Sequence, residues 1–274
     1  MDDANSLRVY FRAALFLSLA GLESVRPALP LIGDLSARWV SNIGLHALNT
    51  GLAVLLGMLG LSAASPAIID LSLGLFPFLT GGLPSWALGL CALLILDLFS
   101  YAVHRLEHRV TALWCLHGVH HADVDLDATT GFRHHPGESL AIMVLGLGFS
   151  LIIGIPTDDW GLYALLASGT ALIQHANLCL PEALDRALRL VVVTPGMHRS
   201  HHAQDRAIHD RNFGTVFSFW DQIFRTCHVL DARARAALPI GLPSHGAHHH
   251  LGLLATFMMP LSLARGTAAR RRCI

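Results

Sequence analysis

Four long apolar runs constrain the fold of this chain more than any other feature. They cover residues 41–61, 86–103, 140–155 and 162–173. Helices of about 17–20 residues rise ~25–30 Å, close to the thickness of the hydrocarbon layer of a bilayer. Only 14% of the residues are charged, against about 25% in soluble domains. We therefore predict an all-α integral membrane bundle with about four core transmembrane helices.

Two shorter apolar segments, residues 68–80 and 251–263, are candidates for re-entrant pieces. The runs at 140–155 and 162–173 form a hairpin, so the polar segments before and after it lie on one side of the membrane. The hairpin turn at 156–159 has two aspartates, whereas residues 181–236 hold eight arginines. The positive-inside bias then predicts that a helical cap on the cytoplasmic side carries these polar segments.

Histidines are concentrated in the polar segments that follow the second and fourth runs. The chain has 18 histidines, and eight of them form one HxxxH and two HxxHH motifs. These are His104-Arg-Leu-Glu-His108, His117-Gly-Val-His120-His121 and His198-Arg-Ser-His201-His202. Residues four apart share one face of a helix, so each motif presents a pair of imidazoles. His120 and His201 stand one residue off that face, free to reach a neighbouring ion.

Clustered neutral imidazoles are typical ligands of transition metals. One metal ion takes about four to six donors, so eight histidines imply two ions. The chain has 19 basic residues, all arginine, and 19 acidic ones. This balance leaves no net charge to attract nucleic acid. Another HxxHH, at His245 to His249, lies beyond the other motifs, and we do not count it among the ligands.

The series of three histidine motifs resembles that of the fatty acid hydroxylase and sterol desaturase superfamily. The likeness extends to Arg133-His-His135-Pro-Gly-Glu138, Gln174-His175-Ala-Asn177, Asn212-Phe-Gly214 and Trp220-Asp221. It covers roughly residues 38–230. Two positions depart from the family pattern: Arg225 stands where glycine is common, and Asp127 replaces a common asparagine. Neither departure removes a histidine.

The resemblance implies a non-haem enzyme that uses two iron ions and molecular oxygen to hydroxylate or desaturate a lipid, with electrons from a separate reductase. It divides the chain into an interfacial or extra membrane segment (1–37), a catalytic domain (38–230) and a C-terminal segment with a basic tail (231–274). Carried over position by position, the metal ligands are His104, His108, His117, His120, His121, His135, His175, His198, His201 and His202.

Carboxylates near these motifs are candidates to accept hydrogen bonds from the ligand imidazoles, which need a partner on the second ring nitrogen. We predict this role for Asp97, Glu107, Asp127, Glu138 and Asp221. Asp97 lies inside an apolar run, where a charge costs roughly 2.5–3.5 kcal/mol. It precedes His104 and His108 by seven and eleven residues, on the same helical face.

Two other functions compete with lipid oxidation. His104 to His108 also fits HxxEH, the inverted zinc-protease pattern, which would make Glu107 a general base in a membrane hydrolase. That interpretation leaves both HxxHH motifs unexplained. A membrane metal carrier or sensor is the second alternative, but its ionisable residues should follow a path through the membrane midplane. Zinc also fits the ligand set, so purified protein is expected to accept zinc in place of iron.

Overall fold

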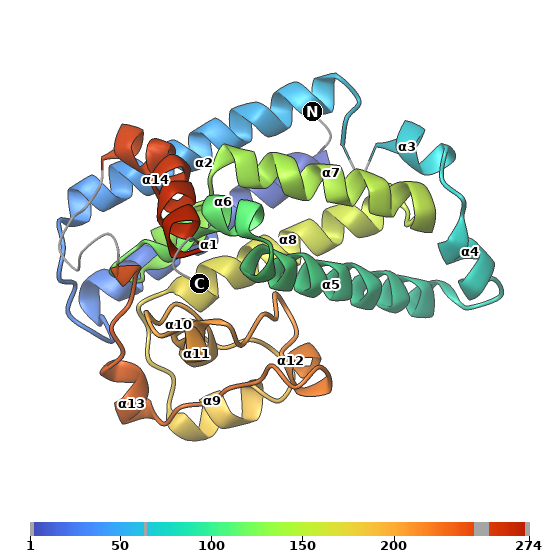
Figure 1. Cartoon of the computed structure of the whole chain (residues 1–274). Helices are drawn as coiled ribbons and strands as arrows, with labels where there is room; N and C mark the ends of the chain where they lie inside the picture. Colours follow the sequence, from blue (N-terminus) through green and yellow to red (C-terminus); the bar gives the residue numbers. More distant parts are fainter. Residues whose placement is uncertain (1–2, 63–64, 244–251, 272–274) are drawn as a thin grey trace.

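The computed structural model describes residues 3–62, 65–243 and 252–271, and over these ranges the chain is all-helical (Figure 1). β-structure in these ranges is limited to two isolated bridges, between Val192 and Phe217 and between Ala203 and Ile240. The predicted all-α class is therefore confirmed.

Five long helices form the bundle: α1 (Asp3–Val25), α2 (Leu35–Met58), α5 (Ser85–Arg109), α7 (Pro136–Ile153) and α8 (Thr157–His175). Among the described residues, α2, α5 and α7 are long and apolar enough to cross a membrane. The 19-residue α8 packs against α1 and α5. Two short helices, α3 (Pro66–Asp70) and α4 (Leu75–Thr80), occupy the segment expected to be re-entrant.

Local sequence signals explain where these helices begin and end. The Asp34 side chain accepts hydrogen bonds from the backbone N–H groups of Ser36 and Ala37, which caps α2. Pro136 starts α7, and Gly154 ends it with a φ of 71°. This left-handed conformation favours glycine, and it lets the chain reverse into α8. The helices α7 and α8 thus form the expected hairpin.

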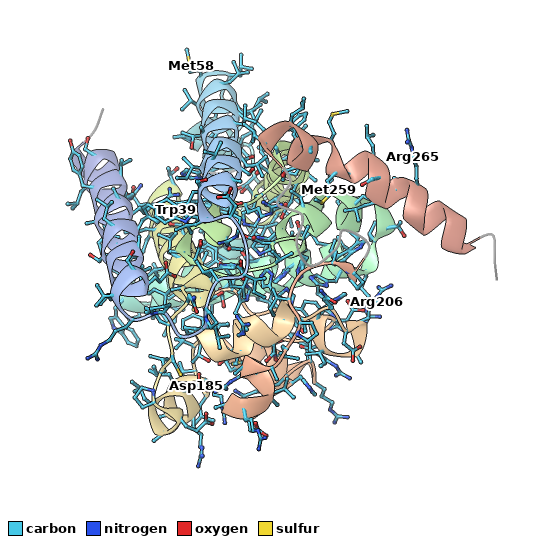
Figure 2. All side chains as sticks on the ribbon, turned by 90° about the vertical axis from the view of Figure 1, so that its left-hand side faces the viewer. Trp39, Met58, Asp185, Arg206, Met259 and Arg265 are labelled. Atoms are coloured by element: carbon cyan, nitrogen blue, oxygen red, sulfur yellow. The ribbon has the colours of Figure 1, made fainter. Side chains whose placement is uncertain are left out.

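The surface of α2 is that of a helix in contact with lipid. Val54, Leu55 and Met58 are 58%, 54% and 81% exposed, far more apolar surface than a water-facing helix presents. Figure 2 shows Met58 at one end of α2 and Trp39 toward the other, with Asp185 and Arg206 beyond Trp39. The apolar helices and the polar cap thus occupy separate parts of the molecule, as in an integral membrane protein.

The cap consists of short helices packed against the Trp39 end of the bundle. They are α6 (Thr111–His121), the 3₁₀ helix η1 (Ala128–Phe132), α9 (Glu182–Leu188), α10 (Pro195–His201), α11 (Arg206–His209), α12 (Phe219–Ile223) and α13 (Ala232–Ala236). The last helix, α14 (Leu253–Arg271), packs across α6 and α2. Leu45, Val119 and Met259 join these three helices in one apolar cluster.

Candidate metal centre

Nine of the ten histidines predicted as ligands converge where α5, α6, α8 and α10 meet. They form two groups, in each of which the candidate ligand atoms all lie within 4.8 Å of one another. The five-histidine group is His104, His108, His117, His121 and His201; the four-histidine group is His120, His175, His198 and His202. His104 is half-buried and the other eight are buried.

Each HxxHH motif contributes to both groups. The first and last histidines of the α6 motif, His117 and His121, belong to the five-histidine group, whereas His120 turns to the other. The second motif does the reverse, because His198 and His202 lie in the four-histidine group and His201 in the five-histidine group. A spacing of four residues keeps two imidazoles on one helical face, and the third, one residue away, points to the neighbouring group.

The nitrogens of the four-histidine group converge on one point. Nε2 of His175 lies 2.8 Å from Nε2 of His198, 3.1 Å from that of His120 and 3.2 Å from that of His202. A neutral imidazole carries one N–H, so protons alone cannot satisfy all of these contacts. Bonds of about 2.0–2.1 Å to one tetrahedral metal ion would place the four nitrogens roughly 3.3 Å apart. The donors therefore fit a metal ion.

Backbone carbonyls orient two imidazoles of the five-histidine group. The Nδ1–H of His104 donates to the carbonyl of Phe213 at 2.9 Å, and that of His201 to the carbonyl of Arg211 at 2.8 Å. A carbonyl only accepts, so Nδ1 carries the proton and Nε2 keeps its lone pair. Nε2 of His201 is buried without a hydrogen-bond partner among the described residues. An unprotonated, unpartnered nitrogen of this kind is expected of a metal ligand.

Carboxylates orient two further imidazoles of this group. Oδ1 of Asp210 lies 3.2 Å from Nδ1 of His108, and Oε1 of Glu138 lies 2.9 Å from Nδ1 of His117. Oε2 of Glu107 is 3.7 Å from the same atom of His117. Glu138 and Glu107 thus approach a ligand imidazole, and a carboxylate there raises ligand basicity.

Electrostatics favour the neutral form of five histidines in the two groups. Burial lowers the pKa of each imidazole well below its ordinary value, and repulsion between neighbouring imidazoles lowers it further, at His120, His121, His198, His201 and His202. A neutral imidazole offers a lone pair to a metal, and a protonated one does not. The arrangement is therefore competent to bind metal near neutral pH.

Asp97 does not contact a histidine, which corrects the prediction that it accepts from a ligand imidazole. Its carboxylate accepts from Tyr163 Oη at 2.9 Å and from Trp220 Nε1 at 2.9 Å. The backbone N–H groups of Val216 and Phe217 donate to it at 3.0 and 3.1 Å. Four donors from distant parts of the chain thus use its oxygens, and Asp97 fixes the loop that carries the carbonyl facing His104.

Asp221 and Asp127 likewise hold backbone rather than imidazoles. Asp221 accepts from the N–H groups of Phe213 and Gly214 at 2.8 and 2.9 Å, and so fixes the same loop as Asp97. Asp127 caps η1 by accepting from the N–H of Thr129 at 2.8 Å. Asp97, Asp221 and Asp127 therefore do not accept the expected hydrogen bond from a ligand imidazole. They bind backbone N–H groups instead and so position the loops around the site.

We predict that Asp97→Asn will destabilise the loop before it changes the metal ligands. The amide NH2 would face N–H and O–H donors, and an unsatisfied buried group costs about 1–3 kcal/mol. Thermal unfolding of the purified variant should begin at a lower temperature, with metal content reduced by less than in a ligand variant. Asp97→Asn protein with wild-type stability would contradict this role.

His135 lies apart from both groups. It caps the start of α7, where its Nδ1 accepts from the N–H of Gly137 at 2.9 Å and its Nε2 lies 3.0 Å from the carbonyl of Phe257. Both ring nitrogens therefore have protein partners. The resemblance assigned His135 as a ligand, but the start of a proline-led helix directs its ring to the helix cap.

Two histidines outside the predicted set border the centre. His134 stacks on His120 with ring centroids 4.5 Å apart, and its Nδ1 lies 2.9 Å from Oε1 of Glu138. The spacing of four residues between His134 and Glu138 is the signal that could have found this pair. His209 stacks on Trp114, beside His108. The motif at His245 to His249 lies outside the described residues.

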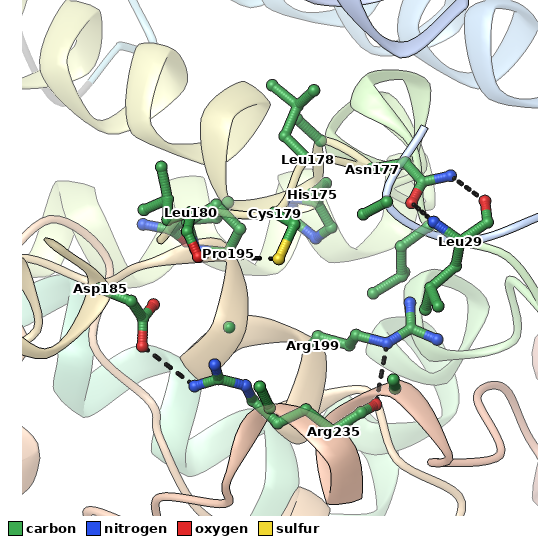
Figure 3. Close-up of a pocket in the computed structure, with 17 residues that line it drawn as sticks. Leu29, His175, Asn177, Leu178, Cys179, Leu180, Asp185, Pro195, Arg199 and Arg235 are labelled. Atoms are coloured by element: carbon green, nitrogen blue, oxygen red, sulfur yellow. Dashed lines mark hydrogen bonds and ion pairs between the residues drawn. The ribbon is translucent and has the colours of Figure 1, made fainter. Parts of the chain in front are cut away.

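A cavity of about 100 Å³ borders the four-histidine group (Figure 3). His175, Cys179 and Arg199 are among the residues that line it. The Nε–H of Arg199 donates to the carbonyl of Arg235 at 3.2 Å, and Arg235 in turn pairs with Asp185 at 3.0 Å. Residues of α9, α10 and α13 also line this cavity, which therefore lies between His175 and the short helices of the cap.

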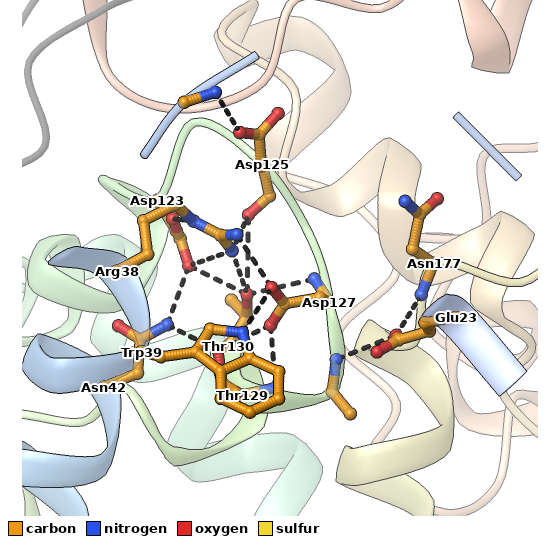
Figure 4. Close-up of polar contacts among 12 residues, drawn as sticks. Glu23, Arg38, Trp39, Asn42, Asp123, Asp125, Asp127, Thr129, Thr130 and Asn177 are labelled. Atoms are coloured by element: carbon orange, nitrogen blue, oxygen red, sulfur yellow. Dashed lines mark hydrogen bonds and ion pairs between the residues drawn. The ribbon is translucent and has the colours of Figure 1, made fainter. Parts of the chain in front are cut away.

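A buried ion-pair network fastens the cap to α2 (Figure 4). The guanidinium of Arg38 donates from Nε to Asp123 at 2.8 Å, from Nη1 to Asp127 at 2.7 Å and from Nη2 to the carbonyl of Asp125 at 2.8 Å. Burial alone would raise the pKa of the Asp123 carboxyl, but Arg38 and Arg133 hold it well below its usual range. Arg38 belongs to none of the sequence motifs, although an arginine at the start of an apolar run needs a partner.

Comparison with known proteins places this arrangement in a family. The family model described as fatty acid hydroxylase matches residues 89–226, which is half of the chain and contains both histidine groups. This chain belongs to the fatty acid hydroxylase family.

Relatives of this family member include proteins named as lipid hydroxylases and monooxygenases. The ornithine lipid hydroxylase OlsE of Rhizobium tropici is 28% identical over 62% of the chain and 49% of that protein. Alkylglycerol monooxygenase of Homo sapiens is 31% identical over 49% of the chain and 29% of that protein. The cholesterol 25-hydroxylase-like protein of Danio rerio is 25% identical over 52% of the chain and 56% of that protein.

The chain therefore spans about half or less of the two relatives named first. No solved structure shows a significant match.

Proposed function

We propose that this chain hydroxylates a membrane lipid with molecular oxygen at two iron ions, one held by each histidine group. The observation that carries the proposal is the pair of neighbouring histidine groups, of which eight of the nine members are buried, at the end of an apolar helical bundle. Oxidation of an unactivated C–H bond requires a metal that changes oxidation state, which favours iron over zinc in the same donors. The named relatives support a lipid substrate.

When bound, the iron ions would supply the activation of oxygen, and the residues of the chain would hold and orient them. Phe213 and Arg211 would fix the ring orientation through their carbonyls, and Asp210 and Glu138 through their carboxylates. Glu138 would hold the Nδ1 protons of both His117 and His134. These contacts would leave Nε2 of the ligand imidazoles free for the metal.

The topology that we propose places the cap in the cytoplasm. The arginines of residues 181–236 belong to the cap, whereas Asp158 and Asp159 start α8 at the other end of the bundle. Residues of the cap would then meet a separate electron-donating reductase from the aqueous side. Labelling of single cysteines in intact cells and in permeabilised cells tests this orientation.

The function is tested with purified protein, reductant and an isotope of oxygen. Protein reconstituted in phosphatidylcholine nanodiscs is analysed for metal, then supplied with a reductase, ¹⁸O₂ and a total lipid extract. We expect about two iron ions per chain and lipid products that carry ¹⁸O. Loosely held, exchangeable metal without oxygen consumption would instead support a metal carrier.

A further inference from the structure

Two adjoining cavities lie between the loop that joins α1 to α2 and the short helices of the cap. The first is the cavity of about 100 Å³ that borders His175, and the second has a volume of about 340 Å³. The residues that line both are Leu29, Leu126, Asn177, Arg199 and Ala236. The two cavities therefore meet around the side chain of Arg199.

The terminal nitrogens of Arg199 have no partner from the described part of the chain. Its Nε donates to the carbonyl of Arg235 at 3.2 Å, but Nη1 and Nη2 form no hydrogen bond or ion pair with the described residues (Figure 3). Neither Nη atom is among the buried polar atoms that solvent cannot reach. A guanidinium that is partly buried beside apolar side chains costs free energy unless an acceptor pairs with it. Both Nη groups are thus accessible donors that lack an acceptor.

The other charged side chains that line the cavities already have partners. Arg235 pairs with Asp185 at 3.0 Å. The carboxylate of Asp125 accepts from two backbone N–H groups, at 2.9 and 3.1 Å, and it forms no ion pair with Arg199. The donors of Arg199 are therefore available to an acceptor from outside the chain. A guanidinium matches carboxylates and phosphates, because its parallel N–H groups reach two oxygens of one anion.

The second cavity lies at the end of the bundle where α2 begins. Residues 29–32 of the α1–α2 loop form part of its wall, together with the apolar side chains of Leu126 and Leu238. Ile32 is exposed and lies three residues before α2, which is long and apolar enough to cross a membrane. A free anion gains nothing from such a wall, whereas an alkyl chain is stabilised by leaving water for it. The lining therefore favours an anion that carries an apolar chain.

We propose that Arg199 binds the carboxylate or phosphate of an anionic lipid, whose chain passes Ile32 toward the bilayer. An uncharged lipid would leave the guanidinium unpaired, and phosphatidylcholine would bring a second cation to it. The site lies outside both histidine groups, although it borders one of them through His175. Binding at Arg199 is measurable whether or not the metal centre oxidises a lipid, so failure of the proposed function would leave this site standing.

The experiment uses the full chain in phosphatidylcholine nanodiscs with a photoreactive hexadecyl phosphate that carries a diazirine in its chain. We expect mass spectrometry to find the label on residues 29–32 and 236–240. Unlabelled hexadecyl phosphate should compete at least tenfold better than hexadecanol, which lacks the charge, and at least tenfold better than inorganic phosphate, which lacks the chain. Equal competition by hexadecanol would overturn the role of Arg199. Equal competition by inorganic phosphate would reveal a free-anion site and overturn the assignment to a lipid.

Removal of the charge is tested with a matched pair of variants. Arg199→Gln should lower the labelling at least tenfold and erase the preference for hexadecyl phosphate over hexadecanol. Arg186→Gln removes an exposed charge from α9, which lies outside both cavity walls at this position, and should change neither result. Unchanged labelling in Arg199→Gln protein would overturn the proposal.

A second pair of variants keeps the guanidinium, because Arg199 follows His198 in the chain and its replacement can disturb the metal centre. Ala236→Leu narrows both cavities, so labelling should fall about fivefold while metal content stays at the wild-type level. Ala183→Leu, at an exposed position of α9 outside both cavities, should label as wild type does. Equal labelling of the two leucine variants would show that the probe does not enter these cavities.

Discussion

Replacing His202 with alanine is expected to leave no more than about one metal ion per chain and to abolish lipid oxidation. Nε2 of His202 lies 3.2 Å from the Nε2 atoms of His175 and His198, so the variant loses one of four converging donors. Loss of a mere hydrogen-bond partner of a ligand already costs about 10–100-fold in metal affinity, and loss of the ligand should cost more. Elemental analysis by mass spectrometry measures the metal, and oxygen uptake measures the activity.

His135→Ala is the matched variant, because it also removes one histidine but from outside both groups. Its expected cost is that of an N-cap, about 1 kcal/mol of stability, with full metal content. If His135→Ala lost as much metal as His202→Ala, the two groups would be an incomplete description of the centre.

Replacing Arg38 with leucine is expected to lower the free energy of unfolding by about 3–5 kcal/mol, because it leaves buried carboxylates without their cation. Arg38 is 2% exposed, and it pairs with Asp123 at 2.8 Å and with Asp127 at 2.7 Å. A large fall in melting temperature in detergent should accompany the change. The same network holds the cap against α2, so the Arg38→Leu protein should also retain less metal.

The exposed Arg26 supplies the control for Arg38. Arg26→Leu removes the same charge from the protein surface, where substitutions usually stay within about 0.5 kcal/mol. A double variant, Arg38→Leu with Asp123→Asn, should recover part of the lost stability, since it removes one of the unpaired charges. Arg38→Leu protein as stable as Arg26→Leu protein would refute a structural role for the network.

The parts of the molecule that depend on local spacing were predictable from the sequence. The apolar runs predicted the long helices, and spacings of three and four residues predicted which imidazoles lie on the same face of a helix. His117 and His121 illustrate this, because one turn of α6 fixes both rings whatever surrounds them.

The contacts of single side chains across the fold were not predictable in this way. Asp97 lies on the expected face of α5, yet three of its four partners come from residues 216–220, whose position depends on the whole cap. Arg38 and Asp123 are 85 residues apart in the chain, and no periodicity links them. His135 shows the opposite failure, because a family pattern assigned it a ligand role that its place at a helix start does not provide.

Each HxxHH motif contributes histidines to both groups, which would make two bound ions interdependent. An ion in either group would be held by histidines of both α6 and α10, so the first ion to bind would order much of the backbone that holds the second. Half-loaded protein should therefore be scarce, and stepwise titration of stripped protein should give a sigmoidal curve. A chelator strong enough to extract one ion would then release its neighbour.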